Sequence, residues 1–207
     1  MQPDLKFSMT PRLNSKFYIL KYDSAMKRLD RKFFARDTER VAKELLGKIL
    51  CREENGVIYR GKIIETEAYT QDDPACHAFC GQTERNKSLF KHPGTLYVYF
   101  TYGMHFCANI STEREGYGSG VLLRALEPVE NINKTNGPAL LCKSMNITKA
   151  LDGSDLTSPV SSIWLQYEDA KLINKKDIVA TTRIGIKKAA ELKRRFYIKD
   201  NRWVSKK

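Results

Sequence analysis

Apolar and polar positions along this chain repeat with short periods that predict a few helices and a larger number of strands. Asp37 is a suitable N-cap, and Gly47 is a suitable residue to follow a helix. The apolar residues between them recur at helical spacing. We therefore expect a helix over Thr38–Leu46.

A β-hairpin is predicted directly after this helix. Asn55-Gly56 separates the strand-like runs Lys48–Glu53 and Val57–Glu67, and an Asn-Gly pair in that setting is the strongest short-range hairpin signal. In the second run, neither set of alternate residues is uniformly apolar. We therefore expect both faces of that strand to be partly covered.

The remaining pattern consists mainly of short strand-like runs. Strands are predicted at Thr95–Tyr102, Met104–Ser111, Val121–Leu126, Ser158–Tyr167, Ile178–Ile186 and Phe196–Ile198, and helices at Ala139–Met145 and Lys187–Leu192. Glu127-Pro128 is expected to end the third of these strands. Because strands outnumber helices and follow one another in sequence, we expect an α+β fold. It would be a single domain with a curved, mostly antiparallel β-sheet, flanking helices and a protruding hairpin.

The first 28 residues show no clear hydrophobic period. We expect residues 1–28 to form an N-terminal extension, disordered or loosely docked, and residues 29–207 to form the functional domain. Met26 is a candidate for the native start, because recognisable organisation begins just after it.

Charge indicates the class of partner. The 207 residues include 36 Lys and Arg against 24 Asp and Glu, a formal net charge of +12. Residues 183–207 hold ten basic residues against two acidic ones, which favours a polyanionic partner over charge kept only for solubility. No apolar run approaches the roughly 18 residues that span a bilayer, and no secretory signal is evident. We expect an intracellular protein with no membrane contact, in the cytoplasm or nucleoid of a bacterium or the nucleus of a eukaryote.

Two glutamates and an arginine are the first candidates for catalysis. Glu65 and Glu67 are two residues apart, which on a strand places both carboxylates on one face, where they share a proton or need a positive partner. Arg124 stands in an apolar run and would be a buried cation in need of an anion. A pair between Glu67 and Arg124 would satisfy both groups, whereas the alternative is an exposed acid pair on an edge strand. A general base must be ionised and held against a water.

Aromatic residues are the second candidates. Tyr97 and Tyr99 share a strand face, Tyr102 occupies a hairpin tip before Gly103, and His77 precedes them. Tyrosines on strands usually pack, and a single histidine is usually structural. Beside a basic surface they suit a pocket for a nucleic-acid base, because base–aromatic stacking contributes about 1–3 kcal/mol. Enzymes that act on a base unstack it first, and an aromatic wedge could fill the gap.

The five cysteines give a third, lesser candidate. Their number is odd and their spacing irregular, so we expect reduced thiols rather than a disulfide framework. Cys76, His77 and Cys80 suggest a structural zinc site, but their spacing matches no standard pairing of zinc ligands.

Ten segments together carry a more specific pattern: FFARDT (33–38), LLGKIL (45–50), GKIIETEAY (61–69), PACHA (74–78), TERN (83–86), PGTLYVYFTYGMHFCANIS (93–111), VLLRALEP (121–128), NGPALLC (136–142), RIGI (183–186) and RFY (195–197). From about Leu29 to Ser205 the chain resembles the alkyladenine DNA glycosylases, also called 3-methyladenine DNA glycosylases. The ETEAY segment and the PGTLYVY, YGM and NIS segments are the most specific. The chain departs from the family at Ala139-Leu140, where a small residue and a lysine are usual.

The resemblance implies a catalytic role for two of the candidates. Glu67 matches the general base that deprotonates the attacking water, and Arg124 matches the arginine that helps to hold that water. The family uses water as its only nucleophile and no metal in the chemistry, so no cofactor is expected.

The resemblance also implies roles in binding the base. Tyr69, His77 and Tyr99 match residues that sandwich and hydrogen-bond the flipped base. Asn109 matches an asparagine that crowds out the guanine amino group, and Tyr102 matches a tyrosine that enters the minor groove.

The implied function is a monofunctional DNA glycosylase of base excision repair. It would flip alkylated or deaminated purines of the 3-methyladenine, hypoxanthine or ethenoadenine type from double-stranded DNA and hydrolyse the N-glycosidic bond, leaving an abasic site. We expect it to act as a monomer. The alternative is a non-catalytic protein that binds damaged or distorted DNA, and Glu67 discriminates because a pure binder has no need of it.

Overall fold

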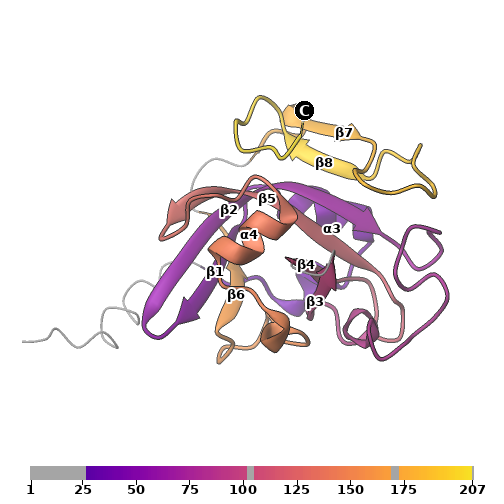
Figure 1. Cartoon of the computed structure of the whole chain (residues 1–207), viewed down its shortest axis with the longest axis horizontal. Helices are drawn as coiled ribbons and strands as arrows, with labels where there is room; N and C mark the ends of the chain where they lie inside the picture. The colour runs from indigo at the N-terminus through magenta and orange to yellow at the C-terminus, as the bar shows by residue number, and fades with distance from the viewer. Residues whose placement is uncertain (1–26, 102–104, 169–172, 207) are drawn as a thin grey trace, which may run out of the picture.

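One long strand, β2 (Val57–Tyr69), organises the fold (Figure 1). The structure, a computed structural model, describes residues 27–101, 105–168 and 173–206. One edge of β2 pairs with β5 (Gly120–Glu130). The other edge pairs with β1 (Ile49–Glu54) in its first half and with β8 (Arg195–Ile198) in its second half. The carboxyl end of β2 is therefore held between β5 and β8.

The outer strands complete an eight-stranded antiparallel sheet in the described residues. Its main order is β3-β4-β5-β2-β1-β6, with β3 at Leu96–Thr101, β4 at His105–Ser111 and β6 at Ile163–Gln166. β7 (Ile178–Thr181) pairs with β8. The sheet curls into a half-barrel, and the β7–β8 hairpin lies across its upper side in Figure 1. These features confirm the predicted α+β class and the mostly antiparallel sheet.

Short helices cover the sheet. They are α2 (Arg31–Phe34), α3 (Thr38–Leu45) and α4 (Pro138–Ser144), with single 3-10 turns η1 (Lys87–Phe90), η2 (Lys149–Leu151) and η3 (Lys175–Asp177). The predicted helix at Thr38 is confirmed, and its N-cap Asp37 accepts a hydrogen bond from the Arg40 amide at 2.8 Å. α3 packs on β2, where the Thr66 hydroxyl donates to the Ala42 carbonyl at 2.9 Å. No helix in the described ranges is long and apolar enough to cross a membrane.

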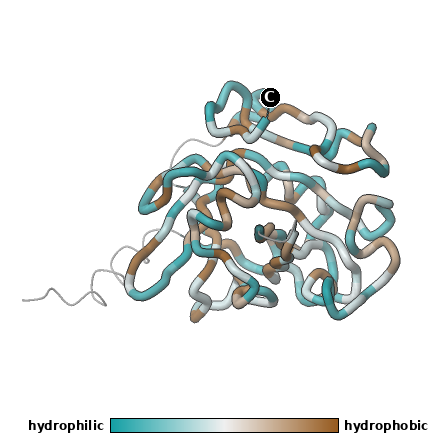
Figure 2. Tube along the Cα trace, viewed as in Figure 1, coloured by the Kyte–Doolittle hydropathy of each residue, from teal (hydrophilic) through white to brown (hydrophobic). Residues whose placement is uncertain are grey.

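The hairpin predicted at Asn55-Gly56 is confirmed as β1–β2. Both residues have positive φ, 52° and 78°, as a two-residue hairpin turn requires. Figure 2 shows this turn as hydrophilic, whereas the second half of β2 is buried on both faces. The core on which β2 packs includes Phe34, Leu45 and Leu126. The strand is therefore exposed to solvent near its turn and buried where it carries Glu65 and Glu67.

Several predicted boundaries are wrong. β5 does not end at Glu127-Pro128 but continues to Glu130, because Pro128 lies beside a register irregularity that lets a strand carry a proline. The predicted strand Ile178–Ile186 ends at Thr181 as β7, whereas the stretch Ser158–Tyr167 does carry a strand, β6. Lys187–Leu192 forms turns and bends rather than a helix.

Two predictions fall wholly or partly on residues outside the described ranges. Tyr102, at the expected hairpin tip between β3 and β4, lies outside them. So do residues 1–26, including Met26. Of the expected extension only Lys27 and Arg28 are described, and both lie along β6, where the Lys27 carbonyl accepts from the Tyr167 amide at 3.0 Å.

Candidate active site

A cavity of about 390 Å³ lies at the carboxyl end of β2. Its volume falls within the range of small-molecule pockets. Six of the predicted site residues belong to the described chain, and all six line this cavity: Glu67, Tyr69, His77, Tyr99, Asn109 and Arg124. Tyr97 and the segment Ile184–Ile186 also line it.

The register of the sheet brings residues from distant parts of the chain into one row. Tyr97 on β3 pairs with Asn109 on β4, and Asn109 pairs with Leu122 on β5. Leu122 in turn pairs with Glu67 on β2. Because neighbouring strands are only about 4.8 Å apart, this row forms a continuous wall with the glutamate at one end.

Glu67 is fully buried, so the alternative of an exposed acid pair is wrong. Tyr69 donates its hydroxyl to Glu67 Oε2 at 2.8 Å, and the Ile184 amide donates to Oε1 at 2.8 Å. Arg124 Nη1 lies 3.3 Å from the same Oε1, which is the pair expected from the sequence. A carboxylate has about four acceptor positions, so Glu67 keeps capacity to accept a hydrogen bond from a water.

Arg124 reaches the glutamates from an irregular point in β5. Leu123 pairs with Thr66, and Ala125 pairs with the preceding residue Glu65, so Arg124 stands opposite no β2 residue of its own. Such a β-bulge re-aims a side chain. Arg124 Nε lies 3.3 Å from Glu65 Oε1, so its guanidinium joins both carboxylates.

Glu65 holds this arrangement from behind. It is fully buried, and its Oε1 accepts from Arg195 Nη1 at 2.8 Å. Ser205 donates its amide to Oε2 at 2.7 Å and its hydroxyl to Oε1 at 3.0 Å. A buried carboxylate needs such partners. They connect the catalytic candidates to the last described residues of the chain.

Aromatic rings line the side of the cavity away from β5. The His77 ring lies 4.5 Å from the Tyr99 ring at 73°, and the Tyr97 and Tyr99 rings lie 5.5 Å apart at 31°. His77 Nδ1 is 3.1 Å from the Tyr97 hydroxyl. Asn86 holds the loop of His77 by donating to its carbonyl at 2.8 Å. The rings are therefore fixed on a wall where a flat base could stack.

Burial sets the protonation of these rings. It raises the pKa of Tyr69 and Tyr99, and it raises the pKa of Tyr97 to about 12. Taken as a whole, the residue His77 is exposed to solvent. The protein packed around its ring and the nearby Arg85 guanidinium nevertheless lower the pKa of His77. Near neutral pH the cavity thus presents uncharged aromatic side chains to an occupant.

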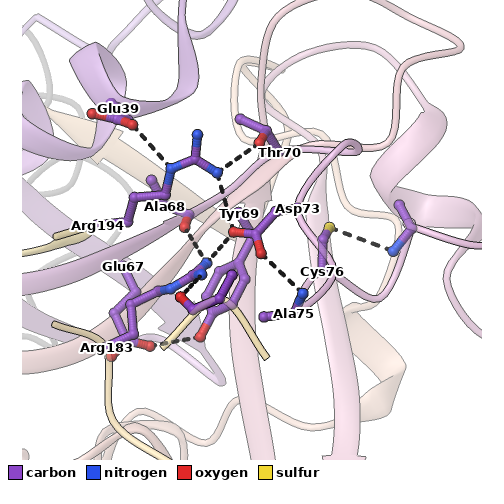
Figure 3. Close-up of polar contacts among 12 residues, drawn as sticks. Glu39, Glu67, Ala68, Tyr69, Thr70, Asp73, Ala75, Cys76, Arg183 and Arg194 are labelled. Atoms are coloured by element: carbon purple, nitrogen blue, oxygen red, sulfur yellow. Dashed lines mark hydrogen bonds and ion pairs between the residues drawn. The ribbon is translucent and has the colours of Figure 1, made fainter. Parts of the chain in front are cut away.

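Two residues of the site were missed as candidates. Ile184 supplies the amide that binds Glu67, and Arg183 precedes it with a fully buried side chain. In the sequence, the RIGI segment at 183–186 stands out only through the family resemblance, and Arg183 stands among the basic residues of the tail. Figure 3 shows Arg183 beside Tyr69 and Asp73.

The basic tail is divided between the inside and the outside. Arg183, Arg194 and Arg195 pair with Asp73, Glu39 and Glu65. The exposed basic residues of the described tail are Lys187, Lys188, Lys193, Lys199, Arg202 and Lys206. Only these remain open to an external polyanion, so the tail exposes less positive charge than its sequence suggests.

The zinc alternative finds no cluster in the part of the chain that the structure covers. Cys76 is buried, with its thiol 3.6 Å from the Gly118 carbonyl, whereas Cys80 is exposed. Among the described residues, no three His, Cys, Asp or Glu side chains gather as metal ligands would.

Comparison with known proteins is consistent along most of the chain. The profile of one family, described as Methylpurine-DNA glycosylase (MPG), matches residues 32–202. A protein of Carboxydothermus hydrogenoformans is 48% identical over 192 residues, which cover 86% of this chain and 99% of its own length. One from Francisella tularensis is 48% identical over 80% of this chain and 92% of its own. One from Clostridium perfringens is 44% identical over 87% and 100%. All three carry the name "Putative 3-methyladenine DNA glycosylase".

Proposed function

This chain belongs to the methylpurine-DNA glycosylase family, and on that premise we propose that Glu67 activates the water that cuts a damaged purine from DNA. Membership makes the protein a DNA glycosylase, a hydrolase of base excision repair whose partner is DNA. One observation carries the proposed role of Glu67. Glu67 is a fully buried carboxylate with a fixed orientation at the end of an aromatic-lined cavity.

In the proposed reaction, Glu67 accepts a proton from a water that Arg124 helps to hold. The water oxygen forms a bond to C1′ of the sugar while the bond from C1′ to the purine nitrogen breaks. The bonding electron pair leaves with the base. The passing oxocarbenium-like charge is stabilised by the nearby carboxylate. The products are a free base and an abasic site.

The proposed substrates are damaged purines in double-stranded DNA, of the 3-methyladenine, hypoxanthine and ethenoadenine type. Tyr69, His77 and Tyr99 would enclose the flipped base, because uncharged rings stack on any base with little regard to sequence. An alkylated purine that carries positive charge leaves without an acid, whereas a neutral one must be protonated.

Two further residues are proposed to act in selection of the base and in capture of the flipped state. Asn109 has its amide nitrogen 3.4 Å from the Tyr97 carbonyl, and this fixed side chain would crowd the amino group of guanine. Tyr102 would enter the space that the flipped nucleotide leaves.

The test is Glu67→Gln, measured with duplexes that each hold one lesion, in the presence of a metal chelator. We expect lesion binding within about threefold of wild type and a loss of base release of at least about 100-fold, the usual lower range for a general base. Glu130→Gln, at the far exposed end of β5, is the matched control and should release base normally.

Two results would contradict the proposal. Unchanged release in Glu67→Gln removes that residue from the mechanism. Binding by the wild-type protein without release of any base in the panel supports the non-catalytic binder instead.

A further inference from the structure

Arg183 takes no direct part in the proposed chemistry, yet it is buried against the residues on which that chemistry depends. We infer that Arg183 is a positioning residue: its guanidinium fixes the segment that presents the Ile184 amide to Glu67, and it fixes the ring of Tyr69. This inference rests on the proposed function, because it assigns to Arg183 the orientation of the proposed base and of one wall of the base pocket.

Arg183 binds the backbone at the end of β2, between Glu67 and Tyr69. Nη1 donates to the carbonyl of Ala68 at 3.1 Å, and Ala68 is the residue between Glu67 and Tyr69. The guanidinium carbon also lies 4.6 Å from the centre of the Tyr69 ring, a cation–π distance. Figure 3 shows the guanidinium, the Tyr69 ring and the Glu67 carboxylate gathered at this point.

The same residue fixes the amide that orients Glu67. Ile184 directly follows Arg183, and its amide donates to Glu67 Oε1 at 2.8 Å. At the other end of this loop, Arg183 Nη2 donates to the Ala189 carbonyl at 3.2 Å. Because one guanidinium ties both β2 and the loop, a shift of Arg183 would move the amide away from the carboxylate.

Asp73 holds the charge of Arg183 in place. The two side chains are fully buried and form an ion pair. Burial opposes ionisation of Asp73, but hydrogen bonds from Arg183 and the Ala75 amide outweigh it and keep its pKa below the ordinary value. Asp73 lies on the turn that leads to His77, so Arg183 also links β2 to the loop that carries the opposite wall of the cavity.

Burial separates the proposed role of Arg183 from direct DNA binding. The Arg183 side chain has no exposed surface and therefore cannot reach a phosphate. Its Nε is buried without a hydrogen-bond partner among the described residues. Such a donor costs stability.

Arg194 is the matched control for Arg183. Its Nη1 lies 3.1 Å from the same Asp73 oxygen and 2.9 Å from the Thr70 hydroxyl, and its Nε lies 3.0 Å from Glu39. Within the described residues, its side-chain hydrogen bonds reach neither Glu67 nor Ala68. Loss of Arg194 thus removes a shared ion pair without releasing the proposed catalytic groups.

The experiment compares Arg183→Gln, Arg183→Lys, Arg194→Gln and Glu67→Gln in the full chain, using a duplex with a single ethenoadenine or hypoxanthine. The measurements are melting temperature, duplex affinity, and single-turnover base release with all DNA bound. We expect Arg183→Gln to lose about 10- to 100-fold in rate, as misplacement by about 1 Å can do. Its duplex affinity should stay within about threefold of wild type.

We expect the other variants to separate position from stability. Arg183→Lys keeps a charge for Asp73 and should recover melting temperature, but not the rate, because it lacks the planar fork that meets both Ala68 and Tyr69. It also serves as the test protein if Arg183→Gln does not fold. Arg194→Gln should lose melting temperature with a rate within about threefold of wild type.

Rates in Arg183→Lys and Arg194→Gln that fall equally, or a wild-type rate in the Arg183 variants, would overturn the inference. If Glu67→Gln is inactive in that case, the proposed function still stands. Wild-type release by Glu67→Gln would instead remove the proposed function and, with it, the role of Arg183.

Discussion

At the residue scale, two buried carboxylates that support the cavity each face two arginines. Glu65 meets Arg124 and Arg195, and Asp73 meets Arg183 and Arg194. A buried pair that loses one partner leaves an uncompensated charge, which costs about 3–5 kcal/mol. The rigidity of the site therefore depends on charge balance.

This balance predicts a pH-dependent stability for Asp73. Its pKa in the folded protein lies below the ordinary 3.8, so its ion pairs stabilise the fold fully above that value, and the contribution is lost as pH falls through the lowered pKa. We expect Asp73→Asn to cost about 3 kcal/mol at pH 7. The difference from wild type should shrink towards zero in strong acid. Urea denaturation at a series of pH values measures it, and a difference that stays constant down to about pH 2 would contradict the assignment.

Single residues also mark what the sequence can and cannot reveal. Arg124 was recognisable as a buried cation because its neighbours are apolar, and Glu67 was its natural partner. Arg183 and Arg195 have no such local signal, since each stands in a basic stretch typical of a surface. Their burial is decided by Asp73 and Glu65, carboxylates more than 100 residues away in sequence.

At the scale of elements, structure fixed by neighbouring residues was predictable and structure fixed by distant contacts was not. The β1–β2 turn follows from Asn55-Gly56 alone. The helix expected at Lys187–Leu192 does not form, because Ala189 has a φ of 46° and its carbonyl binds the Arg183 side chain. The β-bulge at Arg124 is likewise invisible in a pattern of alternating residues, since it depends on the pairing between β5 and β2.

The long β2 strand predicts that stability and chemistry can be changed separately. Gly56, at its turn end, has a φ of 78°, so Gly56→Ala should cost about 1–2 kcal/mol through backbone strain. An added Cβ there meets no neighbour, so packing should not change. Glu67 lies at the opposite end of the strand, and single-turnover base release by the folded variant should remain within about twofold of wild type. Denaturant titration and release assays on the same preparation check both parts, and a large loss of rate in fully folded protein would contradict the separation.

At the scale of the whole molecule, the inward arginines change what the net charge of +12 means for DNA. Three arginines of the basic tail are held by Asp73, Glu39 and Glu65, so its exposed lysines and Arg202 remain to bind phosphate. Lys187 and Lys188 are exposed and directly follow the cavity-lining segment Ile184–Ile186, which places them close to the cavity.

We therefore predict that the double variant Lys187→Gln, Lys188→Gln binds undamaged duplex more weakly than wild type. The slope of log affinity against log salt should also become shallower, by about 0.9 for each phosphate that the two lysines no longer neutralise. Lys175 and Lys176 are exposed at the opposite end of β7, and their paired replacement by Gln is the control of equal charge. Fluorescence anisotropy over a range of salt concentrations measures both slopes. Equal slopes in the two double variants would place the DNA away from the cavity side of the tail. Neither lysine lines the cavity, so base release with all DNA bound should not change. The exposed charge of Lys187 and Lys188 would then govern how tightly DNA is bound, whereas the buried ion pairs govern the cleavage of the base.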